Sequence, residues 1–389
     1  MQEHNQSAKG FGASVPRALE SAYWNIKDLF TAGVTREGLL GLFEKDARET
    51  FRYFTRNIDF AALRSQHWHE RYPRMAWLVF VSLASRMSPP RRVVFAIAVL
   101  AALVAIIQSL TAIARPETVG GLIYWFIAAA LLLLLLLLEL RDKLDLKSDL
   151  EIAREIQFGL VPAGPFVQGD FEVHCFMRPA NTVGGDYYDI IGLGGNGVAI
   201  VIGDVAGKGM PAALLMALLQ GSLRTLITAG FRDGDLIAKL NDYLCESIPA
   251  NSLVTLFYGE LDVAEGVFRY VNAGHNAPFV FRPGQRFERL QATATVLGFQ
   301  RGLDFEAHEM RIGAGEAMLF FTDGITEAFN LSDEEYGEGR LEAFLKKNRD
   351  LPRDKFIQTL IRDVLQFCGP ARPGDDMTLV FVDRKLAAR

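Results

Sequence analysis

Two long apolar stretches constrain this chain more than any other feature. Residues 93–114 contain 22 residues without a charge, and residues 119–138 contain 20 more, ending in an unbroken leucine run. A helix needs about 20 apolar residues to cross the roughly 30 Å hydrocarbon core of a bilayer. Only residues 115–118 separate the stretches, so we expect a tight transmembrane helical hairpin (93–138). A buried pair of soluble helices is the alternative, but such helices seldom sustain apolar runs of this length.

Basic residues flank the two outer ends of this hairpin. Three arginines lie within residues 86–92, three basic residues lie within 141–147, and the intervening turn offers only Arg115. The positive-inside rule therefore places both termini in the cytoplasm. We expect a multi-pass protein of the inner (cytoplasmic) membrane, with everything after residue 138 in the cytoplasm.

Charge and cysteine content exclude several other classes of protein. The chain has 41 basic and 46 acidic residues, a net charge of −5, which argues against nucleic acid as a partner. Its three cysteines are widely spaced, which indicates neither a disulfide framework nor a zinc site. Residues 1–92 carry 14 Lys/Arg against 9 Asp/Glu and are expected to form a basic, mostly helical cytoplasmic region.

A charged segment without proline, residues 139–161, follows the hairpin and is expected to be a helical linker. It carries a narrow apolar seam at helical spacing, formed by Leu146, Leu150, Ala153, Ile156 and Leu160. Such a seam packs either on a second copy of the helix, which predicts a homodimer, or on the downstream domain. Both possibilities remain open from the sequence.

From residue 162 to residue 389 the pattern changes to short β-rich runs separated by glycine-rich turns. Strands are predicted at 171–177, 197–202, 253–261, 267–272, 279–282, 317–321 and 378–382, and helices at 211–228, 236–247, 341–347 and 355–367. Strands joined by hairpins, with helices grouped between them, predict antiparallel sheets covered by helices. The absence of regular βαβ alternation disfavours a doubly wound parallel sheet.

Several carboxylates lie at the ends of these predicted strands, next to glycines. They are Asp186, Asp204, Asp323, Asp375 and Asp376. Oxygen ligands without nearby His or Cys favour Mg²⁺ or Mn²⁺ over zinc. Two such ions about 4 Å apart can bind a phosphoryl group and acidify a shared water. Each aspartate alone could instead cap its turn, but the whole arrangement favours a metal centre.

Five collinear motifs carry a resemblance to a known family. They are Gly-Gly-Asp-Tyr-Tyr-Asp (184–189), Gly-Asp-Val-Ala-Gly-Lys-Gly-Met-Pro-Ala-Ala (203–213), Asn-Ala-Gly-His-Asn-Ala-Pro (272–278), Phe-Thr-Asp-Gly-Ile-Thr-Glu-Ala (321–328) and Asp-Asp-Met-Thr-Leu (375–379). Over about residues 150–385 the chain resembles bacterial metal-dependent serine/threonine phosphatases of the PPM superfamily. The branch is the one named for sporulation stage II protein E and the sigma-B regulators. The resemblance implies an α+β fold, an αββα sandwich of two antiparallel sheets flanked by helices, in residues 162–389.

The resemblance also implies roles for the aspartates in binding two Mn²⁺ or Mg²⁺ ions. Asp204 would bridge the ions, and the backbone carbonyl of Val205 would coordinate one of them. Asp323 and the pair Asp375–Asp376 would supply carboxylates to the other, with Asp375 the better match by position. Asp186 would act directly or through water ligands. Asp186, Asp204 and Asp323 are thus the expected catalytic carboxylates.

Three residues are candidates for contacting the substrate. His275 and Asn276 are expected to shape the cleft, and His275 could be a general acid or a structural residue at a strand end. Relatives in eukaryotes hold the phosphate with an arginine, for which Arg178 is the candidate here. A cysteine phosphatase is excluded because Cys368 and Arg372 are separated by only three residues rather than five.

These expectations combine into one predicted function. The chain would be a membrane-anchored phosphatase that hydrolyses phosphoserine or phosphothreonine on a protein by direct attack of water, without a phosphoenzyme. The resemblance suggests an anti-sigma-factor antagonist with a STAS domain as the substrate. The alternative is a membrane-anchored signalling scaffold with an inactive phosphatase fold.

Overall fold

The computed structural model describes residues 68–85, 87–114, 121–249, 252–370 and 373–386. The chain divides into two compact units, Met1–Arg141 and Asp142–Arg389. Most of the predicted N-terminal helical region and the turn at residues 115–118 lie outside the described residues, so these expectations stay predictions.

Three helices follow one another from residue 68: α4 (Trp68–Ser85), α5 (Pro89–Ala114) and α6 (Gly121–Leu160). Both predicted apolar stretches are helical, and α5 and α6 are long and apolar enough to cross a membrane. Two contacts show that α5 and α6 run antiparallel beside each other. Arg91 pairs with Glu139 at 3.5 Å near one end, and the Trp125 indole donates to Ser109 Oγ at 3.2 Å near the other. The two helices are thus antiparallel, whereas their insertion in a membrane as a hairpin stays a prediction. Helix α6 continues without a break through the predicted linker.

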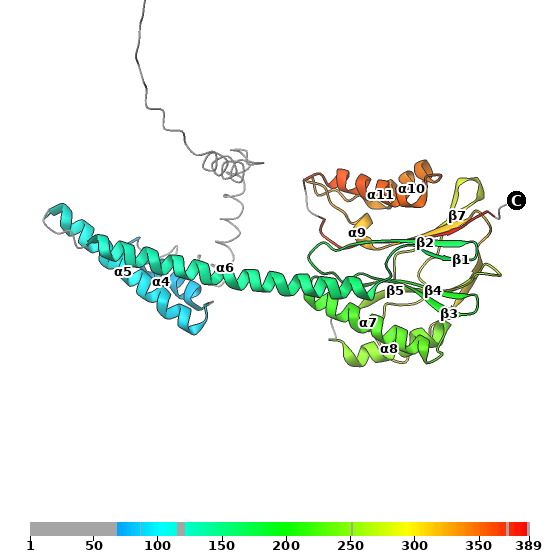
Figure 1. Ribbon diagram of the computed structural model, residues 1–389, viewed down its shortest axis with the longest axis horizontal. Coiled ribbons are helices and arrows are strands. Elements are labelled where there is room, and N and C mark those ends of the chain that lie inside the picture. Colours follow the sequence, from blue (N-terminus) through cyan, green and yellow to red (C-terminus); the bar gives the residue numbers. More distant parts are fainter. Residues whose placement is uncertain (1–67, 86, 115–120, 250–251, 371–372, 387–389) are drawn as a thin grey trace, which may run out of the picture. The chain divides into compact units, whose positions relative to one another are not determined.

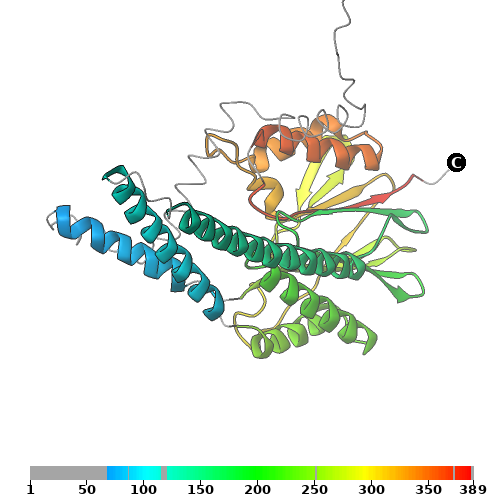
Figure 2. The same ribbon diagram turned by 60° about the vertical axis from the view of Figure 1, so that its left-hand side comes forward.

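The second unit contains two antiparallel sheets, and helices cover the outer face of each (Figure 1; Figure 2). The six-stranded sheet has the order β1 (Phe166–Gln168), β2 (Phe171–Arg178), β11 (Met377–Arg384), β10 (Ala317–Phe321), β7 (Phe279–Arg282), β8 (Arg286–Arg289). The five-stranded sheet has the order β3 (Tyr187–Gly194), β4 (Gly197–Val205), β5 (Val254–Asp262), β6 (Val267–Ala273), β9 (His308–Arg311). The predicted αββα sandwich is confirmed.

The helices divide between the two sheets. Helices α7 (Met210–Thr228) and α8 (Asp233–Ser247) lie along the five-stranded sheet, and α10 (Gly337–Asn348) and α11 (Arg353–Cys368) lie along the six-stranded sheet (Figure 1). A single turn, α9 (Asp323–Thr326), follows β10, and a 3₁₀ turn joins β7 to β8. Helix α7 is a third helix apolar enough to span a membrane, but it buries one face in the core of this unit, so packing on the sheet accounts for its apolar character.

Strand β10 shows why a continuous apolar run was a reliable strand signal. Met318 and Phe320 belong to the core between the sheets, whereas Leu319 and Phe321 belong to the core beneath α10 and α11. Both faces of the strand are covered, so every residue is apolar and alternation disappears. The aromatic rings of Phe257 on β5 and Phe320 on β10 meet edge to face with centroids 5.0 Å apart, which joins the two sheets directly.

All seven predicted strands and four predicted helices of this unit are found, each within a few residues of its expected bounds. Strands β1, β3, β8 and β9 were not predicted. Strand β8 alternates between exposed and half-buried residues that are mostly charged, so it gives no apolar signal. Strand β3 begins with Tyr-Tyr-Asp, and its buried aspartate (Asp189) interrupts the apolar run from which a strand would be predicted.

Candidate active site

Two aspartates meet at one edge of the five-stranded sheet. Asp204 is the penultimate residue of β4, and Asp186 immediately precedes β3. Because β3 and β4 are antiparallel with Tyr187 opposite Gly203, the start of β3 lies beside the end of β4. The fold therefore brings Asp186 next to Asp204, as the sequence predicted.

The six-stranded sheet delivers three more aspartates in the same way. Phe321, at the end of β10, lies opposite Leu379 near the start of β11. Asp323 follows β10, and Asp375–Asp376 precede β11, so these carboxylates share one edge. Antiparallel pairing of two strands thus collects acids that are about fifty residues apart in the sequence.

Asp186 connects the two edges. Its Oδ2 accepts hydrogen bonds from the Thr322 hydroxyl at 2.8 Å and from the Thr378 hydroxyl at 2.5 Å. Both threonines come from the six-stranded sheet, so a carboxylate of one sheet is held by hydroxyls of the other. Burial and the nearby charge of Asp204 raise the pKa of Asp186 well above its usual value, although the bond from Thr378 opposes this.

Asp204 and Asp323 repel each other across the site. Burial, followed by the charges of Asp323, Asp375 and Asp376, raises the pKa of Asp204 to about 7. Burial and the charge of Asp375 raise the pKa of Asp323 to about 6. At neutral pH these carboxylates share a region where negative charge is unfavourable, and a bound cation would relieve that repulsion.

Asp375 and Asp376 have different partners and so different capacities to bind a metal. Asp376 accepts backbone N–H bonds from Ala180 and Gly185, both at 2.7 Å, which commits both its oxygens to holding the loop before Asp186. Asp375 Oδ2 pairs instead with the half-exposed side chain of Lys208 at 2.7 Å, and its Oδ1 accepts the backbone N–H of its neighbour Asp376 at 2.9 Å. Asp375 is therefore the better candidate ligand, as its position in the motif suggested, and Asp376 acts as a positioning residue.

The donor set fits a hard divalent cation but does not enclose one by itself. Among the described residues, no three His, Cys, Asp or Glu side chains already lie close enough together to hold a metal ion. The space beside the Val205 carbonyl is kept open by Gly185, since a Cβ there would lie 2.6 Å from that oxygen and 3.5 Å from Asp204 Oδ1. Carbonyl and carboxylate oxygens are the ligands that Mg²⁺ and Mn²⁺ prefer.

His275 lies in the turn after β6 and is buried. Its Nδ1 shares a hydrogen bond with Thr255 Oγ1 at 2.9 Å, and its backbone N–H donates to Asn272 Oδ1. Burial lowers the pKa of His275 to about 3, so the ring is neutral at physiological pH. Of the two roles left open by the sequence, this environment favours the structural one. Its neighbour Asn276 is half-buried.

Arg178 is the last residue of β2 and is exposed. It lies opposite Met377, two residues after Asp375, so it is at the correct edge of the sheet. The largest electrostatic influences on Asp204 include Lys208 and do not include Arg178. The sequence analysis did not single out Lys208, although it lies within the quoted motif 203–213.

Gln157 is a second residue that the sequence analysis missed. It is buried near the end of α6, where its Nε2 donates to the Gly184 carbonyl at 2.7 Å and its Oε1 accepts from the Gly184 N–H at 3.2 Å. The last turns of α6 thus hold the backbone two residues before Asp186. The position of Gln157 on the same helix face as Ala153 and Leu160 was the available signal.

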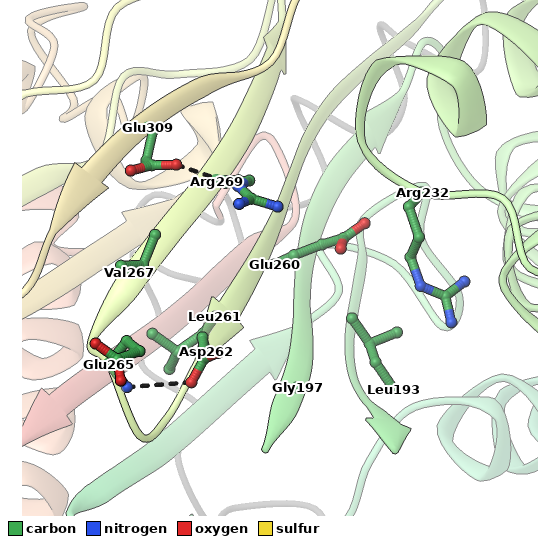
Figure 3. A pocket seen from close by; sticks show the side chains of 10 residues that line it. All are labelled: Leu193, Gly197, Arg232, Glu260, Leu261, Asp262, Glu265, Val267, Arg269 and Glu309. Atoms are coloured by element: carbon green, nitrogen blue, oxygen red, sulfur yellow. Dashed lines mark hydrogen bonds and ion pairs between the residues drawn. The ribbon is translucent and has the colours of Figure 1, made fainter. Parts of the chain in front are cut away.

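A separate pocket lies at the opposite end of β4 from Asp204, next to Gly197 (Figure 3). It has a volume of about 370 Å³, and most of its charged side chains already have partners. Arg269 pairs with Glu309 at 3.2 Å, and Glu260 accepts hydrogen bonds from the Tyr258 hydroxyl and the Asp233 N–H. The converging acids at the other end of the sheets remain the candidate site.

Comparison with known proteins gives matches that cover up to about two thirds of the chain. The family profile described as Stage II sporulation protein E (SpoIIE) matches residues 194–385. Protein IcfG of Synechocystis sp. is 27% identical over 275 residues, covering 63% of this chain and 43% of the relative, so the chain spans less than half of that protein's length. Phosphoserine phosphatase RsbU of Bacillus subtilis is 28% identical over 243 residues, covering 62% of this chain and 72% of RsbU.

A solved structure has a similar fold. The SiaA-PP2C domain of Pseudomonas aeruginosa superposes with a TM-score of 0.55 at 19% identity, covering 62% of this chain and 97% of that domain. This likeness concerns the fold of the sandwich alone.

Proposed function

We propose that the protein is a membrane-anchored, metal-dependent protein serine/threonine phosphatase whose catalytic domain is of the PPM type. The match of residues 194–385 to the SpoIIE profile and the similarity to the phosphoserine phosphatase RsbU support this proposal. The observation that carries the proposal is the convergence of Asp204, Asp323 and Asp375 from two sheets, where burial and then the charge of neighbouring carboxylates raise the pKa values of Asp204 and Asp323. Side chains placed this way are costly unless a cation is bound.

Asp204, Asp323, Asp375 and the Val205 carbonyl would hold the metal, and Asp186 would be reached through water. Bound Mn²⁺ or Mg²⁺, two per site, would neutralise charge on the phosphoryl group and make water a better nucleophile at neutral pH. Hydrogen bonds from two threonine hydroxyls hold the Asp186 carboxylate in place, so we expect it to orient this water without moving itself.

The nearby thiol of Cys175 is poorly suited to replace water as the nucleophile. Cys175 lies on β2, and burial raises the pKa of its thiol to about 12, so it stays protonated at neutral pH. We therefore expect direct in-line hydrolysis of phosphoserine or phosphothreonine, without a phosphoenzyme.

The full-length chain in detergent tests this proposal with p-nitrophenyl phosphate and a phosphoserine peptide, with and without Mn²⁺. Hydrolysis should require the metal and should fall at least about a hundredfold in Asp204→Asn. Asp235→Asn, an exposed aspartate in the first turn of α8, is the matched control and should retain activity. Metal binding without hydrolysis of either substrate would favour the alternative of an inactive scaffold.

The linker helix supports a proposal for control and assembly. On α6, Ala153, Gln157 and Leu160 face the phosphatase domain, whereas Leu146 and Ile156 remain exposed. Exposed apolar residues along a helix favour a second helix as their partner. We propose a homodimer through α6, in which the hairpin biases the Gln157 contact and so the site.

The substrate proposed for this enzyme is a signalling phosphoprotein, such as an anti-sigma-factor antagonist with a STAS domain. RsbU, the relative described as a phosphoserine phosphatase, supports this class of substrate. The two apolar helices α5 and α6 support a location in the cytoplasmic membrane with both termini in the cytoplasm.

A further inference from the structure

One cation lies directly against the candidate metal ligands. Lys208 follows β4 in the turn that leads into α7, and its Nζ lies 2.7 Å from Asp375 Oδ2 and 2.5 Å from the Gly374 carbonyl oxygen. The ammonium therefore joins the turn that carries Asp204 to the segment that precedes β11. Its charge also acts on Asp204 and Asp323.

This ion pair conflicts with metal binding at Asp375. A divalent ion and an ammonium on one carboxylate repel each other, so the lysine must withdraw as the ion binds. It can do so at little cost, because its side chain is 54% exposed. Its other partner is a neutral carbonyl, which does not retain it strongly.

A phosphate monoester that enters this site brings two negative charges close to the displaced ammonium. Lysine binds phosphate as a compact point charge, and it does not need the fixed geometry of an arginine. Arg178, the earlier candidate for this role, is not among the strongest electrostatic influences on the site aspartates.

We propose that Lys208 is an exchangeable counter-charge: it pairs with Asp375 when the metal is absent and binds a phosphate oxygen of the substrate once metal occupies Asp375. This inference rests on the proposed metal-dependent phosphatase function. It assigns the phosphate-binding role to the motif turn after β4 rather than to β2.

The test uses the full-length chain in detergent and measures two binding constants by calorimetry: Mn²⁺ alone, and inorganic phosphate at saturating Mn²⁺. In Lys208→Gln, Mn²⁺ affinity should rise about two- to fivefold, since a competing ion pair is removed. Phosphate affinity should fall about tenfold or more, since a charged hydrogen bond is lost. Lys208→Arg should keep both constants within about threefold of the wild type.

Lys346→Gln is the matched control, because Lys346 is 53% exposed and pairs with Glu342 at 2.6 Å on α10. It should change neither constant. Weaker Mn²⁺ binding in Lys208→Gln would show that the lysine only holds the turn after β4 against the segment before β11. Unchanged phosphate affinity would show that another residue contacts the phosphate. Either result would overturn the inference. A wild-type chain that binds no Mn²⁺ would overturn the proposed function itself. Mn²⁺ binding by the wild type, with neither binding constant changed in Lys208→Gln, would overturn only this inference.

Discussion

At the scale of single residues, the candidate site gathers carboxylates whose negative charge is unfavourable when no cation is bound. The pKa of Asp204 is raised to about 7, chiefly by burial and then by the charge of neighbouring aspartates. Asparagine at this position has the same shape without the charge. If Asp204 binds the metal as proposed, its charge favours metal affinity and lowers the stability of the metal-free fold.

We expect Asp204→Asn to stabilise the metal-free protein at pH 8 by about 1–3 kcal/mol, because repulsion with Asp323 and Asp375 disappears. The same substitution should abolish the stabilisation that Mn²⁺ gives to the wild type. Thermal unfolding with EDTA and with Mn²⁺ measures both effects. A variant less stable than the wild type in EDTA would contradict the proposed repulsion.

Metal affinity should depend on pH through the same two carboxyl groups. Their folded-state pKa values, about 7 for Asp204 and about 6 for Asp323, lie above the unfolded value of 3.8. The folded state therefore binds protons more tightly than the unfolded state, and this proton binding stabilises it at low pH. That stability is lost as pH rises through the folded-state pKa values. Mn²⁺ must displace these protons. Apparent Mn²⁺ affinity should therefore increase between about pH 5 and pH 7 and level off above, and a pH-independent affinity would contradict the assignment.

In contrast to the two aspartates, His275 is not expected to contribute to the pH dependence of the enzyme. With a pKa of about 3 it is already neutral at working pH, so it cannot supply the acid limb of a pH–rate profile. We expect His275→Gln to destabilise the fold by about 1–3 kcal/mol through the lost bond to Thr255, without shifting the profile of the remaining activity. A displaced acid limb in the variant would restore His275 as a general acid.

The sequence could predict which aspartates the fold brings together, but it could not predict the different hydrogen-bond partners of each one. Glycine beside aspartate at a strand end marks Asp204 and Asp323 clearly. Nothing in the pair Asp375–Asp376 tells which carboxylate turns toward the backbone of Ala180 and Gly185, because that depends on a loop almost two hundred residues away. The ion pair of Lys208 could not be predicted for the same reason, because its partner Asp375 lies in another motif.

At the scale of elements, two helices are tied to the five-stranded sheet by buried polar contacts. Arg224 of α7 donates two hydrogen bonds of 2.7 Å to the fully buried carboxylate of Asp189 on β3. We expect Arg224→Leu to cost about 3–5 kcal/mol of unfolding free energy, because a buried charge loses its partner. Arg269→Leu, which breaks an exposed pair with Glu309, should cost less than about 1 kcal/mol in the same denaturation experiment.

The end of α6 is the second such element. Gln157→Leu keeps the volume but removes both bonds to the Gly184 backbone, so the loop before Asp186 should loosen and Mn²⁺ affinity should fall about three- to tenfold. Gln168→Leu is the control, since Gln168 makes one exposed bond of 3.3 Å to Gly195 at the other end of β3. Equal Mn²⁺ affinity in both variants would remove the proposed link between linker and site.

At the scale of the whole molecule, the apolar helices α5 and α6 predict a hairpin with both outer ends in the cytoplasm. Thr118→Cys should be labelled by a membrane-impermeant maleimide in intact cells, whereas Ser88→Cys should be labelled only after lysis. The reverse pattern would invert the topology. This part of the chain could be predicted from hydropathy alone, because in a bilayer the backbone must satisfy its own hydrogen bonds.

The edge-to-face contact of Phe257 and Phe320 has a consequence for ion choice. Phe320 lies three residues before Asp323, and Phe257 lies opposite Ile202, two residues before Asp204, so the two rings pack between the sheets close to the candidate ligands. A thinner layer narrows the gap between the two carboxylates, and a smaller gap suits a smaller ion. We therefore expect Phe320→Leu to shift the preference from Mn²⁺ toward the smaller Mg²⁺ by changing the spacing of the two sheets, with every candidate ligand left in place.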